Sequence, residues 1–161
     1  MSNHSDALKT IALCLVALSL GIVQSIPLAI IFPESLSLGL SRREGLMILS
    51  MWGVAAPVLL LIQSTLNKLP HNIYLVLSGS VCCLGYISFY FLVTLPPLYY
   101  LYLAGVARFT SGLGLLLLNN KTAVSLTLHL HGHVGRASTL WEIFNSTGIA
   151  AGITRDKMLE L

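Results

Sequence analysis

The sequence predicts an all-α membrane protein with about five transmembrane helices, and three observations carry this prediction. Charged residues make up only 9 % of the 161 residues, whereas a soluble domain of average composition has about 25 %. Apolar residues make up 55 % of the chain, and the mean hydropathy is +0.83. The apolar residues are gathered in five long runs with short connectors between them. Such a chain has too few polar side chains for a water-facing surface, so lipid is its expected solvent.

Each apolar run has roughly the length of a membrane-spanning helix, which needs about 20 mainly apolar residues. The first run is longer than the core of a signal peptide and no small-residue cleavage site follows it, so we expect a helix there. The fifth run is short, and a charged sequence follows it. The expected spans are residues 8–32, 43–63, 72–93, 97–120 and 138–153, with an N-terminal tail at 1–7 and a C-terminal tail at 154–161.

Stop and start signals lie between the first two runs. We expect Phe32 and Pro33 to end the first helix, because proline lacks a backbone donor and restricts the residue before it. Ser41 and Glu44 have the S-x-x-E spacing of a capping box, in which each side chain accepts a hydrogen bond from the other residue's backbone amide at the start of a helix. A polar turn at 67–72 and a proline-containing turn at 95–98 complete the short connectors.

The longest expected connector, residues 121–136, contains the string HLHGH. Three nearby histidines raise the question of a metal site. The H-x-H-x-H spacing suits a strand better than a helix, however, and neither a carboxylate nor a cysteine accompanies it, so we expect a protonatable loop and no bound metal. The histidines are His129, His131 and His133.

Ionisable and amide side chains fall inside the expected spans. An ionisable residue there costs about 2.5–3.5 kcal/mol on insertion scales, and such residues usually mark pathways or sites. Arg108 lies in the fourth span and Glu142 in the fifth, and Asn145 follows Glu142 by three residues and so shares its helical face. Gln24 lies in the first span. We expect Arg108 and Glu142 to be paired or close beside a polar cavity on a substrate or proton pathway, with Asn145 and Gln24 on the same pathway. The alternative is a structural ion pair, and for Gln24 a packing hydrogen bond.

Glycines form a second group in the last two spans. Gly112 and Gly114 follow Arg108, and Gly148 and Gly152 form a G-x-x-x-G pattern. Small residues at this spacing let two helix backbones approach closely, so we expect all four to serve helix packing.

Several function classes find no support in the sequence. The basic residues are scattered and not interleaved with aromatics, which argues against nucleic acid as a partner. Cys14, Cys82 and Cys83 lie in apolar runs without the spacing of a zinc site or a disulfide framework. No nucleophile–base pair, phosphate loop or dinucleotide fingerprint is present. We therefore expect neither an enzyme nor a bound cofactor.

The order of these features resembles the N-terminal half of the major facilitator superfamily. The string GVARFTSGLG at 105–114 is similar to the fourth-helix motif of that family, in which an arginine precedes G-x-G. The string GRASTLWEIFNSTGIAAG at 135–152 resembles the linker and fifth helix of its drug:proton antiporter branch. Within that branch the likeness is closest to the vesicular amine and polyamine transporters, which have a first helix ending in Phe-Pro and a fifth-helix glutamate, as at 32–33 and at Glu142.

The resemblance implies the partial N-terminal bundle of a proton-coupled antiporter. It places Arg108 in the coupling or binding region, Glu142 facing the central cavity and Gln24 in the cavity-lining part of the first helix. Gly148 and Gly152 would belong to the antiporter motif.

The likeness covers about residues 10–152, and the loop after the second span keeps only Leu66 of the family's loop motif. We expect these 161 residues to lack the sixth helix and the second half of that fold. Transporters of this fold bind substrate between two halves. We therefore expect a truncated transporter of a vesicle or plasma membrane whose full-length form exchanges protons for organic cations such as amines, polyamines or drugs. The alternative is a non-transporting membrane protein that binds and modulates a full-length transporter. The expected partners are lipid and either a full-length transporter or a second copy of the chain.

Overall fold

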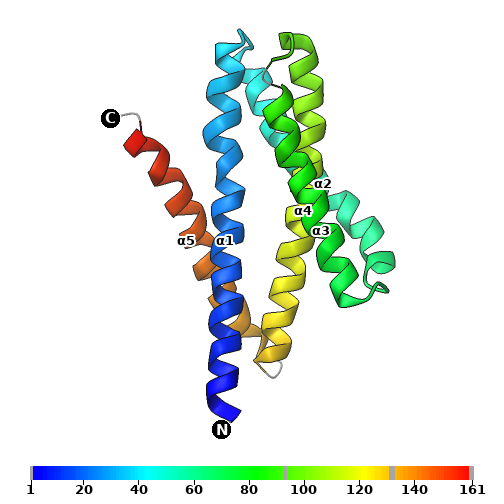
Figure 1. The fold of residues 1–161 in the computed structure, drawn as a ribbon, viewed down its shortest axis with the longest axis vertical. Coiled ribbons are helices and arrows are strands. Elements are labelled where there is room, and N and C mark those ends of the chain that lie inside the picture. Colours follow the sequence, from blue (N-terminus) through cyan, green and yellow to red (C-terminus); the bar gives the residue numbers. More distant parts are fainter. Residues whose placement is uncertain (1, 93, 131–132, 160–161) are drawn as a thin grey trace. The chain divides into compact units, whose positions relative to one another are not determined.

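Five α-helices make up the computed structural model, which describes residues 2–92, 94–130 and 133–159. No strand occurs within these ranges, so the predicted all-α class is confirmed. In chain order the helices are α1 (Ser2–Ser37), α2 (Arg42–Leu66), α3 (His71–Leu92), α4 (Pro97–His129) and α5 (Val134–Leu159) (Figure 1).

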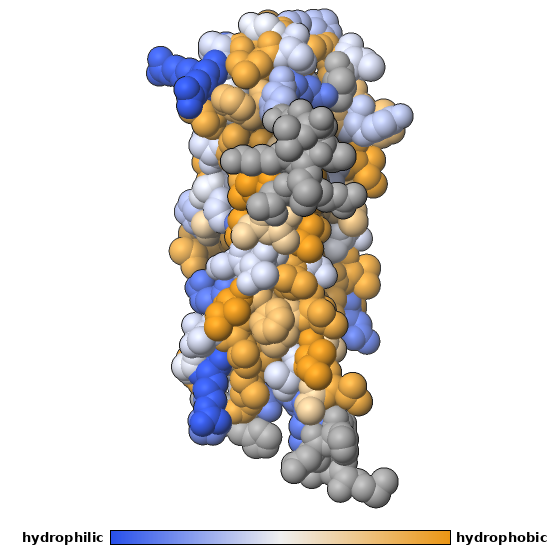
Figure 2. Space-filling view, turned by 90° about the vertical axis from the view of Figure 1, so that its left-hand side faces the viewer, coloured by the Kyte–Doolittle hydropathy of each residue, from blue (hydrophilic) through white to orange (hydrophobic). Residues whose placement is uncertain are grey.

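Four of these helices, α1 to α4, are long and apolar enough to cross a membrane. In the described part of the chain α5 does not reach the same apolarity, because Glu142, Asn145 and several serines and threonines interrupt its apolar sequence. The surface fits a lipid environment: hydrophobic side chains cover much of the face drawn in Figure 2, and Leu61 and Tyr90 are each 81 % exposed. Apolar exposure on this scale marks a surface made for lipid or protein contact.

The first helix does not end at Phe32 and Pro33, so that prediction is wrong. It continues to Ser37 with two prolines inside it, which apolar helices tolerate because neighbouring groups and local adjustments satisfy the freed backbone atoms. The stop signal is Gly39, whose φ of +80° is the left-handed conformation that glycine adopts freely. The amide of Gly39 bonds the carbonyl of Leu36 and the amide of Leu40 bonds the carbonyl of Ser35, each at 3.0 Å. This is the pattern of a Schellman cap.

The predicted capping box at the start of α2 is confirmed. The backbone amide of Ser41 donates to Oε2 of Glu44 at 2.7 Å, and the amide of Glu44 donates to Oγ of Ser41 at 3.3 Å. The next two connectors also lie where the sequence places them, between α2 and α3 and between α3 and α4. Pro97 opens α4 at the first helical position, where its missing amide has no partner to lose.

The fourth and fifth helices are longer than predicted. α4 continues past Asn120 to His129, so the connector expected at 121–136 is mostly helical. Residues 121–129 contain several good helix formers, among them Lys121, and neither proline nor glycine. α5 begins at Val134 and runs to Leu159, so 154–159 continue the helix and do not form a separate tail. His131 lies outside the described residues.

The chain divides into two compact units, which we describe separately. The terminal unit comprises residues 1–26 and 119–161, and the central unit comprises residues 27–118. The boundary therefore falls inside α1 and inside α4. A buried cluster in the central unit joins the end of α1 with α2, α3 and the first part of α4. Its members are Ile31, Leu40, Ile48, Phe89, Leu92, Tyr100, Ala104 and Ala107.

Candidate functional site around Arg108

Arg108 is buried in the central unit, with 4 % of its surface exposed. Its guanidinium group forms a side-chain hydrogen bond with Tyr86 of α3. Within the described residues its Nε and Nη1 atoms have no hydrogen-bond partner. A buried polar group without a partner is costly, and a buried charge more so. Arg108 is therefore a charge whose hydrogen-bonding capacity is only partly used.

Close packing of α3 against α4 positions this pair. A Cβ atom added to Gly85 would lie 2.6 Å from Cβ of Ser111, and one added to Gly114 would lie 2.7 Å from Cα of Cys82. Real Cβ atoms do not approach other atoms so closely, so both positions require glycine. Figure 1 shows the two helices running side by side. Because Gly85 immediately precedes Tyr86, this close approach brings the Tyr86 side chain within reach of Arg108.

Trp52 of α2 lies on another side of α4. A Cβ atom at Gly112 would be 3.2 Å from Cγ of Trp52, so the absence of a side chain at Gly112 makes room for the indole. The indole Nε1 is buried and has no partner within the described residues. Gly112 follows Arg108 by one helical turn. The central unit thus buries unused N–H donors on both α2 and α4.

Donors without acceptors define what this part of the molecule can bind. Arginine and the tryptophan indole only donate hydrogen bonds, and arginine stays charged in proteins. The matching group is an acceptor, such as a carboxylate, a carbonyl or a water molecule. Arg108 would repel an organic cation, so a cation would need an acidic side chain elsewhere.

In the terminal unit, α5 packs against the first part of α1 through glycines at positions that the sequence singles out. A Cβ atom at Gly148 would lie 3.0 Å from the amide nitrogen of Ile22, and closer still to the carbonyl oxygen of Leu18. A Cβ atom at Gly152 would meet the side chain of Ser25. The close backbone approach expected of the G-x-x-x-G pattern therefore occurs between α5 and α1, and both glycines lie in this contact.

Polar residues of the terminal unit differ in their exposure. Asn145 is 7 % exposed, and its Oδ1 atom has no hydrogen-bond partner in the described chain. Glu142, predicted to share a helical face with Asn145, is exposed instead. Residues three apart lie about 60° apart around a helix, so Asn145 can face α1 while Glu142, on the same broad side of α5, is exposed. Gln24 on α1 is half-buried.

Among the described residues, no group of three His, Cys, Asp or Glu side chains lies close enough together to hold a metal ion. His129 instead donates from Nε2 to the backbone carbonyl of Asp6 at 2.8 Å, which ties the end of α4 to the start of α1.

Arg108 belongs to the central unit and Glu142 to the terminal unit, so their pairing stays a prediction. The sequence reasoning missed Tyr86 and Trp52. Both lie in apolar runs, where an aromatic residue is typical of lipid-facing or core positions, and no local pattern distinguishes them.

The chain matches no protein-family model, no curated protein and no solved structure.

Proposed function

We propose that this chain is the N-terminal part of a major-facilitator-type transporter whose full-length form exchanges protons for organic cations. The observation that carries the proposal is Arg108: a buried guanidinium group inside a 33-residue apolar helix, with two nitrogen atoms unpartnered among the described residues. Intramembrane charges of this kind usually serve a pathway or a site.

Within the central unit, the surroundings of Arg108 favour a functional role over a structural ion pair. A structural ion pair would place a carboxylate against the guanidinium group. The side chain that bonds Arg108 in the central unit is the phenol of Tyr86, which carries no charge at neutral pH. Tyr86 orients Arg108 and leaves other donors free for an acceptor.

Glu142 would supply the acidic group that such a transporter needs. It is exposed on α5 and has Thr139 and Ser146 three residues before and four after it, both also exposed. Residues at these spacings lie on one side of a helix. This polar strip suits a water-filled path or a protein partner better than lipid. A carboxylate there can attract an organic cation when ionised and carry a proton when neutral.

Vesicles containing the full-length form provide the test. With an imposed proton gradient, we expect uptake of a labelled monoamine or polyamine, and we expect Glu142→Gln to abolish it. Thr139→Val, a change on the same exposed strip that leaves the carboxylate in place, is the matched control and should retain uptake. Normal uptake by the Glu142→Gln form would refute the assignment.

The second candidate function, a non-transporting protein that modulates a full-length transporter, also draws on α5. Gly148 and Gly152 are already occupied by α1, so a partner would bind the exposed side that carries Glu142. Co-purification with a full-length transporter, lost in Glu142→Leu and kept in Lys68→Gln, would favour this function. A chain that purifies alone and leaves uptake unchanged on co-expression would exclude it.

A further inference from the structure

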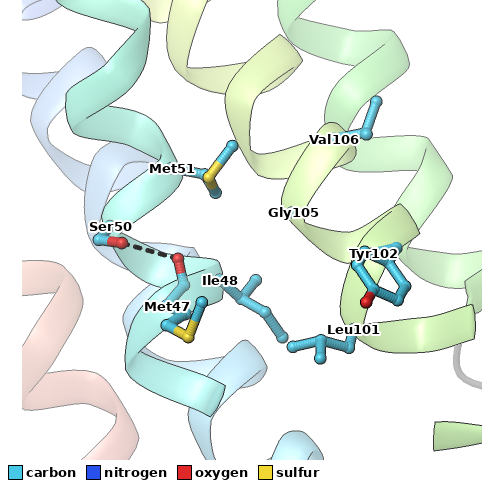
Figure 3. A pocket seen from close by; sticks show the side chains of 8 residues that line it. All are labelled: Met47, Ile48, Ser50, Met51, Leu101, Tyr102, Gly105 and Val106. Atoms are coloured by element: carbon cyan, nitrogen blue, oxygen red, sulfur yellow. Dashed lines mark hydrogen bonds between the residues drawn. The ribbon is translucent and has the colours of Figure 1, made fainter. Parts of the chain in front are cut away.

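A groove of about 400 Å³ lies between α2 and α4 in the central unit (Figure 3). The α2 side is formed by Met47, Ile48 and Met51, and the α4 side by Leu101, Gly105 and Val106. Gly105 has no side chain to fill the groove from the α4 side. A Cβ atom there would lie 3.6 Å from Cγ of Met51, which is an ordinary van der Waals contact. The groove is therefore shaped by hydrocarbon and thioether groups and by one missing side chain.

The polar side chains at the groove, Ser50 and Tyr102, do not require a polar ligand. Ser50 donates its hydroxyl hydrogen bond to the backbone carbonyl of Met47 at 2.8 Å, as the dashed line in Figure 3 shows. Tyr102 stands at the rim with 68 % of its surface exposed. In a helix that crosses a membrane, such a groove suits a linear hydrocarbon chain.

Positive charge lies at one end of the groove. Arg43 precedes Met47 by four residues, so the two lie on one side of α2 about 6 Å apart along its axis. Arg42 and Arg43 are both exposed. The adjacent acidic residue, Glu44, has its carboxylate held by the amide and hydroxyl of Ser41. The amino-terminal end of α2 adds its own partial positive charge.

The same end of the central unit has the aromatic residues typical of a membrane–water interface. Tyr90 and Phe91 near the end of α3, and Tyr99 and Tyr102 near the start of α4, are each more than 60 % exposed. Exposed tyrosines gather at the depth of lipid headgroups. We therefore expect the two arginines at the start of α2 at headgroup depth. The groove begins about one turn further along, at the level of Tyr102, and extends from there toward the acyl chains.

We propose that this groove binds an anionic phospholipid, with one acyl chain between α2 and α4 and the phosphate at Arg42 and Arg43. The apolar walls select a chain, and the two arginines with the helix end select negative charge. The site does not depend on transport activity and uses no residue of the Arg108 site.

Photo-crosslinking in lipid nanodiscs tests the site. The probes are phosphatidylglycerol and phosphatidylcholine carrying a diazirine on one acyl chain, each at one part in ten of a phosphatidylcholine bilayer. We expect the phosphatidylglycerol probe to label the peptides containing residues 47–51 and 101–106 more strongly than the phosphatidylcholine probe. Arg43→Gln should lower that labelling by about fivefold, from the usual attraction of one basic residue to anionic lipid. The matched Lys68→Gln, in the turn that follows the other end of α2, should not lower it.

Filling the groove provides the second arm. Gly105→Leu should abolish labelling of both peptides, whereas Gly53→Leu, which adds the same side chain to an open position on α2, should leave it unchanged. Val106→Trp enlarges a side chain that lines the groove at a position already 58 % exposed, and we expect it to fill the groove. Val106→Trp is used in place of Gly105→Leu if the Gly105→Leu protein is not helical and monodisperse.

Three results would overturn the proposal. Equal labelling by the two probes with no response to Arg43→Gln would show ordinary contact with bulk lipid. Full labelling after the groove is filled would place the lipid elsewhere. Loss of lipid labelling as protein crosslinks to a second copy through residues 47–51 would show that the groove is a protein interface.

Discussion

A Cβ atom on Gly148 of α5 would lie 3.1 Å from Cα of Gly21 on α1, and one on Gly21 would lie 3.0 Å from the carbonyl carbon of Asn145. Each glycine thus faces the backbone of the opposite helix. Backbone cannot rotate away as a side chain can. The contact that holds α1 and α5 together in the terminal unit therefore requires glycine on both sides.

Gly148→Ala should lower the free energy of unfolding by about 1–3 kcal/mol, because the added methyl group overpacks a contact made of backbone. Gly135→Ala is the matched control on the same helix, since nothing lies within 4 Å of its Cβ position. The control should be neutral or stabilising by up to about 1 kcal/mol, from the higher helix propensity of alanine. Detergent titration followed by circular dichroism measures both. Equal effects of the two substitutions would contradict the packing account.

Tyr100→Phe should also destabilise the protein. The Tyr100 side chain is fully buried, and its hydroxyl donates to Oε2 of Glu34 at 3.2 Å. Removing the hydroxyl leaves a half-buried carboxylate with one partner fewer, at a loss of about 1–3 kcal/mol. Tyr99→Phe removes the same atom from a neighbouring side chain that is 62 % exposed, and should change stability by no more than about 0.5 kcal/mol. Thermal unfolding in detergent distinguishes the two variants.

Ser41→Ala should remove the cap of α2. The serine hydroxyl accepts from the amide of Glu44 and donates to its carboxylate, so alanine leaves an amide at the helix start without this acceptor. The expected loss is about 1 kcal/mol. Ser37→Ala removes an exposed hydroxyl that bonds only its own helix, to the carbonyl of Glu34, and should have a smaller effect in the same assay. A larger loss in Ser37→Ala would show that the box does not stabilise α2.

Local chemistry explains which parts of this fold the sequence could predict. The capping box and the two short turns between α2, α3 and α4 depend on residues within a few positions of one another. The end of α1 also depends on local chemistry, although the residue that ends it is Gly39 and not the predicted Pro33. Apolar helices tolerate proline, whereas the left-handed turn at Gly39 ends the helix.

Contacts between distant residues could not be predicted in the same way. Arg108 stands out in the sequence because its charge conflicts with its surroundings. Tyr86 precedes it by more than twenty residues, in a run where a tyrosine is unremarkable, and only the packing of α3 against α4 brings the two together. The same holds for Gly21, which carries no signal of its own until Gly148 lies opposite it.

Arg108 offers the sharpest test of whether a residue serves function or stability. Within the central unit, its charge is buried with two unpartnered nitrogen atoms and bonds the neutral phenol of Tyr86. Replacing buried charged groups by apolar residues of similar volume is often stabilising by about 1–4 kcal/mol. The double variant Arg108→Met with Tyr86→Phe removes both polar partners and should unfold at a higher detergent concentration than the wild type.

The proposed transport function predicts that the same double variant loses proton-driven uptake in the full-length form, because the donors that an acceptor would use are gone. The matched control is Tyr86→Phe alone, which keeps the charge and should reduce uptake only in part. Greater stability together with lost uptake is the expected combination. A double variant that is less stable than the wild type would instead assign Arg108 a structural role, because the protein would then have needed the charge to fold.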